Sequence, residues 1–173
     1  MKSYLSLKGY ALRMLLLPLT LLLLSCSVQN SMDRKGLVPL HKKITGNFQN
    51  SIIVEPDREV RLSRFFELND KDSIVQINSV KNKLVVSFID SLGAKHHKVF
   101  EGKFKKKYFQ FHLKYDTVLV PPLVATIDEL RVRLSLDERG NLVINNYYDS
   151  SGIILFFGAG GSGNSKYVFT KTQ

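Results

Sequence analysis

Apolar and polar residues alternate along much of the chain after residue 44, which is the pattern of β-strands that bury one face. Val132, Leu134 and Leu136, for example, alternate with Arg131 and Arg133. Turn-forming residues interrupt these runs about every 8–14 residues, a spacing typical of all-β sandwiches and barrels. The pattern predicts strands over residues 44–48, 74–80, 84–90, 97–104, 108–115, 130–136, 142–148, 153–157 and 166–171.

Breaks in the alternation predict the connections between these strands. Apolar residues at 62, 65 and 66 have helical spacing and predict a short helix around residues 60–68. Residues 137–141 and 149–152 are rich in Asp, Gly, Ser and Asn and predict turns. The glycine-rich run 158–163 predicts a connection between the last two strands.

One hairpin is predicted residue by residue. If Lys105 and Lys106 form a two-residue turn, Phe104 pairs with Lys107, and Gly102 leaves room for Phe109. This register is favoured because it divides the two strands into an aromatic face and a polar face. The aromatic face holds Phe100, Phe104, Phe109, Phe111, Leu113 and Tyr115, and the polar face holds His97, Val99, Glu101, Lys103, Tyr108, Gln110, His112 and Lys114.

Amphipathic strands joined by short turns leave unpaired edges unless the sheet closes on itself. We therefore expect an all-β domain: an antiparallel up-and-down barrel of about eight strands with one short N-terminal helix. The aromatic face of the hairpin, together with Phe48, is expected to form the core of this barrel or to line a ligand cavity.

The N-terminal segment reads as an export signal rather than as part of the fold. Lys2, Lys8 and Arg13 precede an apolar run over residues 14–24, which is too short for a membrane span of about 20 residues. The run ends in Leu23-Leu24-Ser25-Cys26, which resembles the lipobox of bacterial lipoprotein signals.

The lipobox resemblance implies diacylation of the Cys26 thiol, cleavage before Cys26 and acylation of the new amino group. Two or more acyl chains anchor a protein firmly to a membrane. Ser27, rather than Asp, follows the cysteine, which in the well-studied sorting rule favours the outer membrane, facing the periplasm. The expected organisation is a signal peptide (1–25), an acylated Cys and flexible tether (26–43) and a β-barrel-like domain (44–173).

The strand segments also resemble the lipocalin-like domains of small outer-membrane lipoproteins of Bacteroidetes. Phe48 stands where the first lipocalin strand usually has Trp. The resemblance implies a barrel that holds a small apolar or amphiphilic ligand. It rests on Ile44-Thr45-Gly46-Asn47-Phe48, Glu101-Gly102-Lys103-Phe104, Tyr108-Phe109-Gln110-Phe111, Leu130-Arg131-Val132-Arg133-Leu134, Gly140-Asn141-Leu142, Asn146-Tyr147-Tyr148-Asp149 and Phe157-Gly158-Ala159-Gly160-Gly161.

The same bacteria O-glycosylate Asp-Ser/Thr-apolar tripeptides. Three such tripeptides occur here, and the resemblance therefore implies candidate glycosylation at Ser73, Ser91 and Thr117.

No set of residues supports catalysis, a cofactor or a metal site. The run 158–163 matches Gly-x-Gly-x-x-Gly, but a dinucleotide site needs a following helix, and residues 167–169 read as a strand. His97 and His112 share one face of the predicted hairpin, yet zinc usually needs three or four ligands, and the chain has a single cysteine. We therefore expect a protein that is not an enzyme.

Positive charge is concentrated at the predicted hairpin tip, in a chain of net charge +10. Lys103, Lys105, Lys106 and Lys107 could face an anionic surface or could keep the strand tip soluble. Export argues against nucleic acid, which leaves lipid phosphates and acidic glycans as natural polyanions. Two functions stay open: binding of a small apolar ligand inside the barrel, or a packed protein that docks another envelope component.

Overall fold

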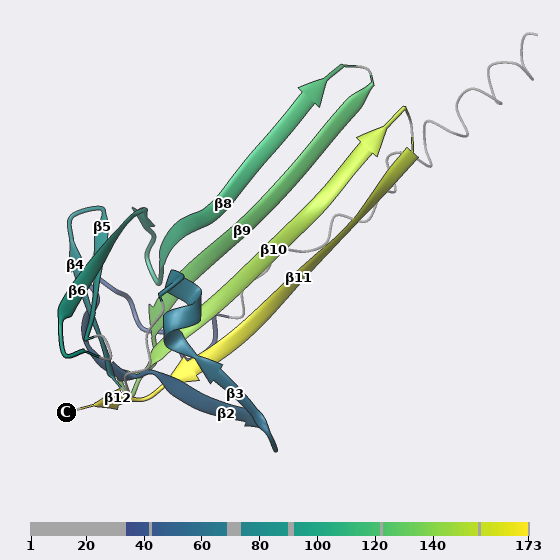
Figure 1. The fold of residues 1–173 in the computed structure, drawn as a ribbon. Helices are drawn as coiled ribbons and strands as arrows, with labels where there is room; N and C mark the ends of the chain where they lie inside the picture. Colours follow the sequence, from purple (N-terminus) through teal and green to yellow (C-terminus); the bar gives the residue numbers. More distant parts are fainter. Residues whose placement is uncertain are drawn as a thin grey trace, which may run out of the picture.

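The structure, a computed structural model, describes residues 34–41, 43–68, 74–89, 92–121, 123–155 and 157–172. Most of these residues form antiparallel β-sheet, so the expected all-β class is confirmed. The strands make two five-stranded sheets and a separate hairpin (Figure 1).

The first sheet has the strand order β12-β1-β4-β5-β6 and the second has the order β11-β10-β9-β8-β7. The first sheet comprises β1 (Thr45–Gln49), β4 (Ile74–Val80), β5 (Lys83–Ile89), β6 (Lys95–Glu101) and β12 (Lys171–Thr172). The second comprises β7 (Lys103–Phe104), β8 (Phe109–Val120), β9 (Val124–Leu136), β10 (Leu142–Ile154) and β11 (Phe157–Phe169). The hairpin pairs β2 (Ser51–Glu55) with β3 (Arg58–Arg61).

No closed barrel is found among the described strands. Neighbouring strands are mostly consecutive in the chain, as an up-and-down order requires, but hydrogen bonding stops at β6 and β12 in one sheet and at β7 and β11 in the other. The chain passes from the first sheet to the second at Gly102 and returns at Thr170, and no described strand of one sheet pairs with a strand of the other.

Gly102 allows the change of sheet because its neighbours leave no room for a side chain. A Cβ atom there would lie 2.5 Å from the carbonyl oxygen of Gln110 and 2.5 Å from Cζ of Phe109. The expectation that Gly102 makes room for Phe109 is therefore confirmed.

The two sheets enclose one hydrophobic core. Phe48 of the first sheet, Phe66 of the connecting segment and Phe109 and Phe111 of the second are at most 1% exposed. The rings of Phe66, Phe109 and Phe111 form a series of contacts that includes Phe100, whose ring centroid lies 4.7 Å from that of Phe111. Of the aromatic residues that the sequence placed inside, Phe48, Phe100, Phe109 and Phe111 are buried, and Phe104 is partly buried against the core.

The helix expected around residues 60–68 is a 3₁₀ helix of five residues, η1 (Leu62–Phe66), and no α-helix occurs in the described part of the chain. Asn50 explains the local fold, because its Oδ1 accepts a hydrogen bond of 2.8 Å from the Ser63 N–H. Leu62, Phe65 and Phe66 turn inward, as the apolar spacing predicted.

The predicted hairpin register is wrong by two residues. Phe104 pairs with Phe109 rather than with Lys107, and the Lys105 N–H donates to the Tyr108 carbonyl oxygen across a longer loop. Strand β6 does not pair with β8 at all, because it turns into the first sheet and pairs with β5.

Tyr115 is exposed, so its predicted place in the core is also wrong. The pairing of β8 with β9 shifts register between His112 and Lys114. This bulge reverses the in-and-out alternation, and Tyr115 therefore lies beside His112 instead of Phe111, with its side chain 60% exposed.

Residues 34–41, which the sequence placed in the flexible tether, lie against the second sheet. Leu37 forms a bridge with Asp137, and the Leu40 N–H donates to the Lys106 carbonyl oxygen. Leu37 and Leu40 are 5% and 4% exposed. These two leucines give the segment an apolar face that packs on the rest of the domain. Residues 34–41 are therefore part of the folded domain, although their composition is mostly polar.

Candidate functional site

The second sheet is much longer than the first and extends away from the rest of the molecule as an arm (Figure 1). We define the arm as residues 114–130 of β8 and β9 and residues 148–163 of β10 and β11, and the rest of the described domain as the body. The strands stay paired in register along the whole arm, as far as Val120 opposite Val124 and Ile154 opposite Phe157.

The arm was not expected from the alternation of apolar and polar residues. Residues 149–152, expected as a turn, lie within β10, and the glycine-rich run 158–163, expected as a connection, lies within β11. Both are strands because each pairs residue by residue with its neighbours: Ser151 opposite Ile127 and Gly160, and Gly152 opposite Thr126 and Ala159.

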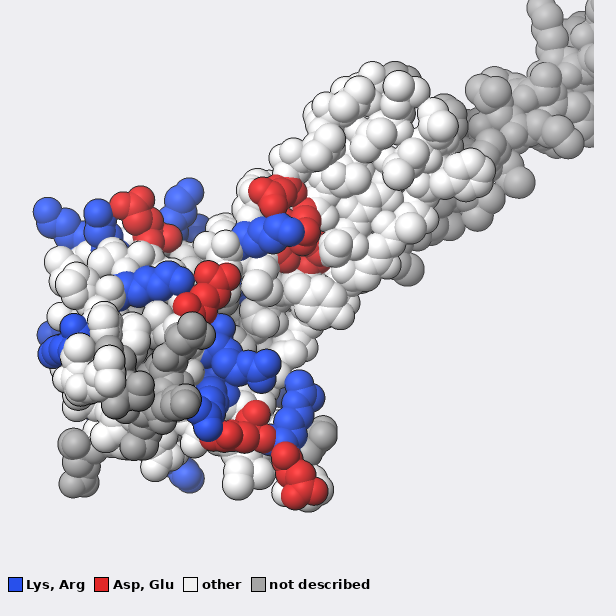
Figure 2. Space-filling view, viewed as in Figure 1, with Lys and Arg blue, Asp and Glu red and all other residues white. Residues whose placement is uncertain are grey.

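The outer part of the arm carries no charged residue. We call residues 117–127 and 151–160 the arm end; neither segment contains Lys, Arg, Asp or Glu. Figure 2 shows basic and acidic side chains over the body and in a band across the arm, and none beyond that band. The exposed large apolar side chains of the arm end are Val118, Leu119, Val120, Leu123, Ile127, Ile153, Ile154, Leu155 and Phe157.

These apolar side chains lie on both faces of the sheet. Leu119, Ala125 and Ile153 are opposite one another in the register, and the next row, on the other face, contains Val120 and Ile154. The side chains of Leu119 and Phe157 are 72% and 83% exposed. A surface of this kind on a soluble protein usually marks a contact with a membrane or another protein.

The arm end also forms an open groove of about 980 Å³ on one face. Its lining includes Thr117, Leu119, Ile127 and Ile153, and towards the body it reaches Tyr147 and Asp149. The groove is therefore apolar at the outer end and polar where the arm meets the body.

Paired charges mark the inner limit of the arm end. Lys114 forms ion pairs with Asp128 and, at 3.8 Å, with Asp116. The neighbouring carboxylates raise the pKa of Lys114, chiefly through its hydrogen bond with Asp128. We call Lys114, Asp116, Asp128, Glu129, Arg131 and Asp149 the charged band.

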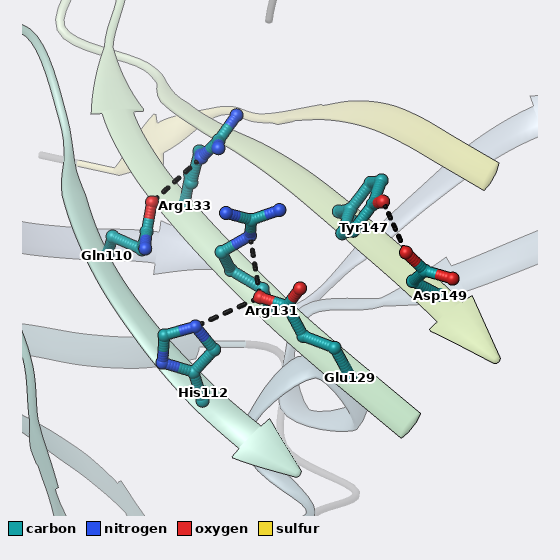
Figure 3. A network of polar contacts seen from close by, with 7 residues as sticks. All are labelled: Gln110, His112, Glu129, Arg131, Arg133, Tyr147 and Asp149. Carbon is teal, nitrogen blue, oxygen red and sulfur yellow. Dashed lines mark hydrogen bonds and ion pairs between the residues drawn. The ribbon is translucent and has the colours of Figure 1, made fainter. Parts of the chain in front are cut away.

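The opposite face of the band contains a polar network (Figure 3). Glu129 Oε1 lies 3.0 Å from His112 Nε2 and 3.1 Å from Arg131 Nε. The Arg131 guanidinium lies 4.6 Å from the ring centroid of Tyr147. The Tyr147 hydroxyl donates to Asp149 at 3.1 Å, so these charges are held by one another.

Burial shifts the pKa of two groups on this face. It raises the pKa of the Tyr147 hydroxyl, and the hydrogen bond with Asp149 adds to the effect. Burial also lowers the pKa of the Arg133 guanidinium, with a second contribution from the charge of Arg131. Arg133 donates to Gln110 at 3.0 Å and lies over the ring of Tyr108, so it is a structural group covered by neighbouring side chains.

The four lysines of the predicted tip lie on β7 and the loop that follows it. Lys103, Lys105 and Lys106 are exposed, and Lys107 is half-buried, with its Nζ 3.4 Å from the carbonyl oxygen of Arg34. The loop therefore keeps a basic surface on the body, at the opposite end of β8 from the arm end.

The aromatic residues expected to form the core or to line a cavity lie in or against the core, apart from Tyr115. None of the three grooves found on the described surface is lined by Phe48, Phe100, Phe104, Phe109, Phe111 or Tyr115. Five of these side chains pack against one another or the neighbouring core, and Tyr115 is exposed on the arm.

The other candidate sites have different outcomes. Leu23, Leu24, Ser25, Cys26, Ser73 and Ser91 lie outside the described residues, so the lipid-attachment site and two candidate glycosylation sites stay predictions. Thr117 is exposed at the base of the arm end. His97 pairs with Ser87 in the first sheet and His112 with Arg131 in the second, so the two histidines do not share a hairpin.

Comparisons with known proteins add no relationship. No family model, curated protein or solved structure matches this chain. No helix within the described residues has the length and apolar character needed to cross a membrane, and these residues contain no cluster of three or more potential metal-binding side chains.

The arm end could have been found in the sequence from its charge pattern. Charged residues are absent from 117–127 and again from 150–165, and each interval is centred near a turn between apolar runs. The alternation rule missed it because both faces of the sheet are apolar there, so no period of two residues appears.

Proposed function

We propose that this chain is a non-enzymatic envelope lipoprotein, anchored through acylated Cys26, whose packed body holds the arm end in the membrane. The observation that carries the proposal is the arm end itself, a charge-free sheet with apolar side chains exposed on both faces. We place the protein at the outer membrane, facing the periplasm, on the resemblance of residues 23–26 to a lipobox and on Ser27, rather than Asp, after the cysteine.

The dimensions of the arm end fit one leaflet of a bilayer. Residues 117–120 of β8 separate the charged band from the turn. At about 3.4 Å for each strand residue they extend about 14 Å. The hydrocarbon of a bilayer is about 30 Å thick, so one leaflet is about 15 Å deep.

The energetics of burial support the same arrangement. Nine large apolar side chains of the arm end are each 43% or more exposed. Moving a half-exposed Val, Leu, Ile or Phe into hydrocarbon contributes about 1 kcal/mol, so the set contributes on the order of 10 kcal/mol. No charged side chain opposes the transfer until the charged band is reached.

The charged band matches the polar interface of a membrane. Tyr115 and Tyr148 are 60% and 50% exposed beside the band. Tyrosine is enriched at membrane interfaces because its ring is apolar and its hydroxyl is polar. Pairing within the band, such as Arg131 with Glu129, reduces the repulsion of its carboxylates from anionic lipid.

A hollow, ligand-binding barrel is the other function that the sequence leaves open. It would need an interior space, whereas Phe48, Phe66, Phe109, Phe111 and Phe169 are at most 1% exposed in the core between the sheets. This packing favours the docking function over the ligand-binding one.

Vesicle binding of the mature chain without its lipid tests the proposal. The protein is residues 26–173 with Cys26→Ser, which keeps residues 34–41 that pack on the sheet. It should co-sediment with phosphatidylethanolamine–phosphatidylglycerol vesicles, and Phe157→Asp should weaken binding about 10-fold or more, because a Phe side chain contributes about 1.5–3 kcal/mol on burial.

Two further variants complete the experiment: a control on the body and a charge reversal on the basic loop. Val99→Asp places the same charge at a 46% exposed position of the body and should leave vesicle binding unchanged. Lys105→Glu with Lys106→Glu should reduce binding at low salt and have little effect at high salt, because lysine–lipid attraction is screened within about 8 Å at physiological salt. Equal losses for Phe157→Asp and Val99→Asp would refute the arm's role.

The anchor is tested separately in the host. Wild-type protein should incorporate a labelled fatty acid and lose its signal, and Cys26→Ser should do neither, because only the cysteine thiol forms the thioether. Labelling of the Cys26→Ser variant would refute the lipoprotein assignment.

A further inference from the structure

The two outer strands of the arm have free edges. Within the described sheets, β11 pairs only with β10, and β8 pairs with β7 only at Phe109 and Gln110. On their outer sides, residues 111–120 of β8 and residues 157–165 of β11 therefore have no partner strand among the described residues. An edge of this kind presents a row of backbone N–H and C=O groups that another strand can pair with.

The β11 edge of the arm lacks the features that usually prevent such pairing, whereas β8 has a bulge after His112 and carries Lys114 and Asp116. Strands at sheet edges are commonly protected by charged residues, proline or a bulge. The edge strand β6 of the body carries Lys95, Lys98 and Glu101. In contrast, residues 157–165 of β11 contain neither charge nor proline, and β11 pairs with β10 without a register shift.

The directions of the strands determine how two arms could pair. β8, β9, β10 and β11 are antiparallel to their neighbours, so β8 and β11 run in opposite directions. The β11 edge of one copy placed beside the β8 edge of another therefore continues the antiparallel sheet with both arms pointing the same way. Antiparallel β8–β8 pairing would point the two arms in opposite directions.

The side chains of the two edges are complementary in size. Thr117, Val118 and Leu119 of β8 lie at the heights of Gly160, Ala159 and Gly158 of β11, whereas Val120 lies at the height of Phe157. A Cβ atom at Gly161 would meet no other atom within 4 Å, so the space beside β11 is open there.

We propose that the partner of the arm is a second copy of this chain, paired head to tail through the β11 edge of one copy and the β8 edge of the next. This inference rests on the proposed function: hydrocarbon offers no water to the free backbone groups, so an arm end in the membrane needs its edges paired. Because the two edges differ, each copy can pair on both sides, and the assembly continues beyond two copies.

Disulfide cross-linking of the full-length protein in host membranes tests this pairing. The variant carries Thr117→Cys on β8 together with one cysteine on the same face of β11, scanned over Gly158, Ser162 and Asn164. The two positions are three strand spacings apart, about 14 Å, which is too far for a bond within one chain. Cys26 is the only native cysteine, and its thiol is acylated under the proposed function.

After oxidation, at least one of the double variants should give a ladder of three or more copies on a non-reducing gel. Each single variant should give no species larger than a dimer. Adding Gly161→Lys should abolish the ladder because it places a charge on the β11 edge, and the matched Gly161→Ser should preserve it.

Absence of any species larger than a dimer across the scan would overturn the pairing, and vesicle binding separates this failure from that of the proposed function. A non-acylated double variant that binds vesicles like the wild type, but whose full-length form makes no ladder, contradicts only the pairing of copies. Failure of the non-acylated protein with the wild-type arm to bind vesicles contradicts both the pairing of copies and the proposed function.

Discussion

At the scale of single residues, burial rather than residue type decides which aromatic side chains stabilise the body. Phe111 is 1% exposed among other aromatic rings, whereas Tyr115 is 60% exposed beyond the bulge in β8. Phe111→Ala should lower the free energy of unfolding by about 3–5 kcal/mol because it leaves a cavity. Tyr115→Ala should lower it by less than about 1 kcal/mol. Chemical denaturation measures both changes in the free energy of unfolding, and equal losses would contradict the burial of Phe111 and the exposure of Tyr115.

Tyr147 makes part of the stability depend on pH. Burial and the Asp149 hydrogen bond raise its pKa above the ordinary value of 10.0, so folding favours the neutral phenol. This contribution is complete below pH 10 and is lost as the pH rises through the folded-state pKa. Tyr147→Phe should therefore unfold with a weaker alkaline decline above pH 10 than the wild type, in urea titrations at a series of pH values. An identical decline would show that the hydroxyl is not linked to folding.

At the scale of elements, the change of sheet between β6 and β7 depends on the absence of a side chain at Gly102. Gly102→Ala should destabilise the fold by about 1–3 kcal/mol because its Cβ would overlap Gln110 and Phe109. Gly161→Ala is the matched control, since its Cβ meets no atom within 4 Å, and it should be neutral. Thermal unfolding of both variants compares them, and equal melting temperatures would contradict the role of Gly102.

The sequence predicts elements well where one face is buried and poorly where the environment changes. Alternation placed Val132 and Leu134 inward, and both are 0% exposed. The two-residue hairpin at Lys105 failed because β6 pairs with β5 before it rather than with β8 after it, and alternation alone does not show which neighbour a strand pairs with. The turn expected at 149–152 failed because pairing on both sides of β10 overrides the preference of Ser and Gly for turns.

At the scale of the whole molecule, charge divides the protein into two parts. The body carries the exposed lysines at 103, 105 and 106, and the arm end carries no charge at all. This division supports the proposal that the body lies in water and the arm end lies in lipid. The candidate site could be predicted only in part. Cys26 has a motif of its own, whereas the arm end shows in the sequence only as two separate charge-free segments, which become one surface once four strands are paired.

Tryptophan fluorescence tests that proposal most directly, because the chain has no native Trp. Phe157→Trp reports on the arm end and Val99→Trp on an exposed position of the body, each in the acylated protein reconstituted in vesicles. Emission from Phe157→Trp should shift to the blue and be quenched by lipids brominated along their acyl chains, and Val99→Trp should do neither. If the emission of Phe157→Trp has the wavelength of indole in water and is not quenched by brominated lipid, the arm end does not lie in the membrane.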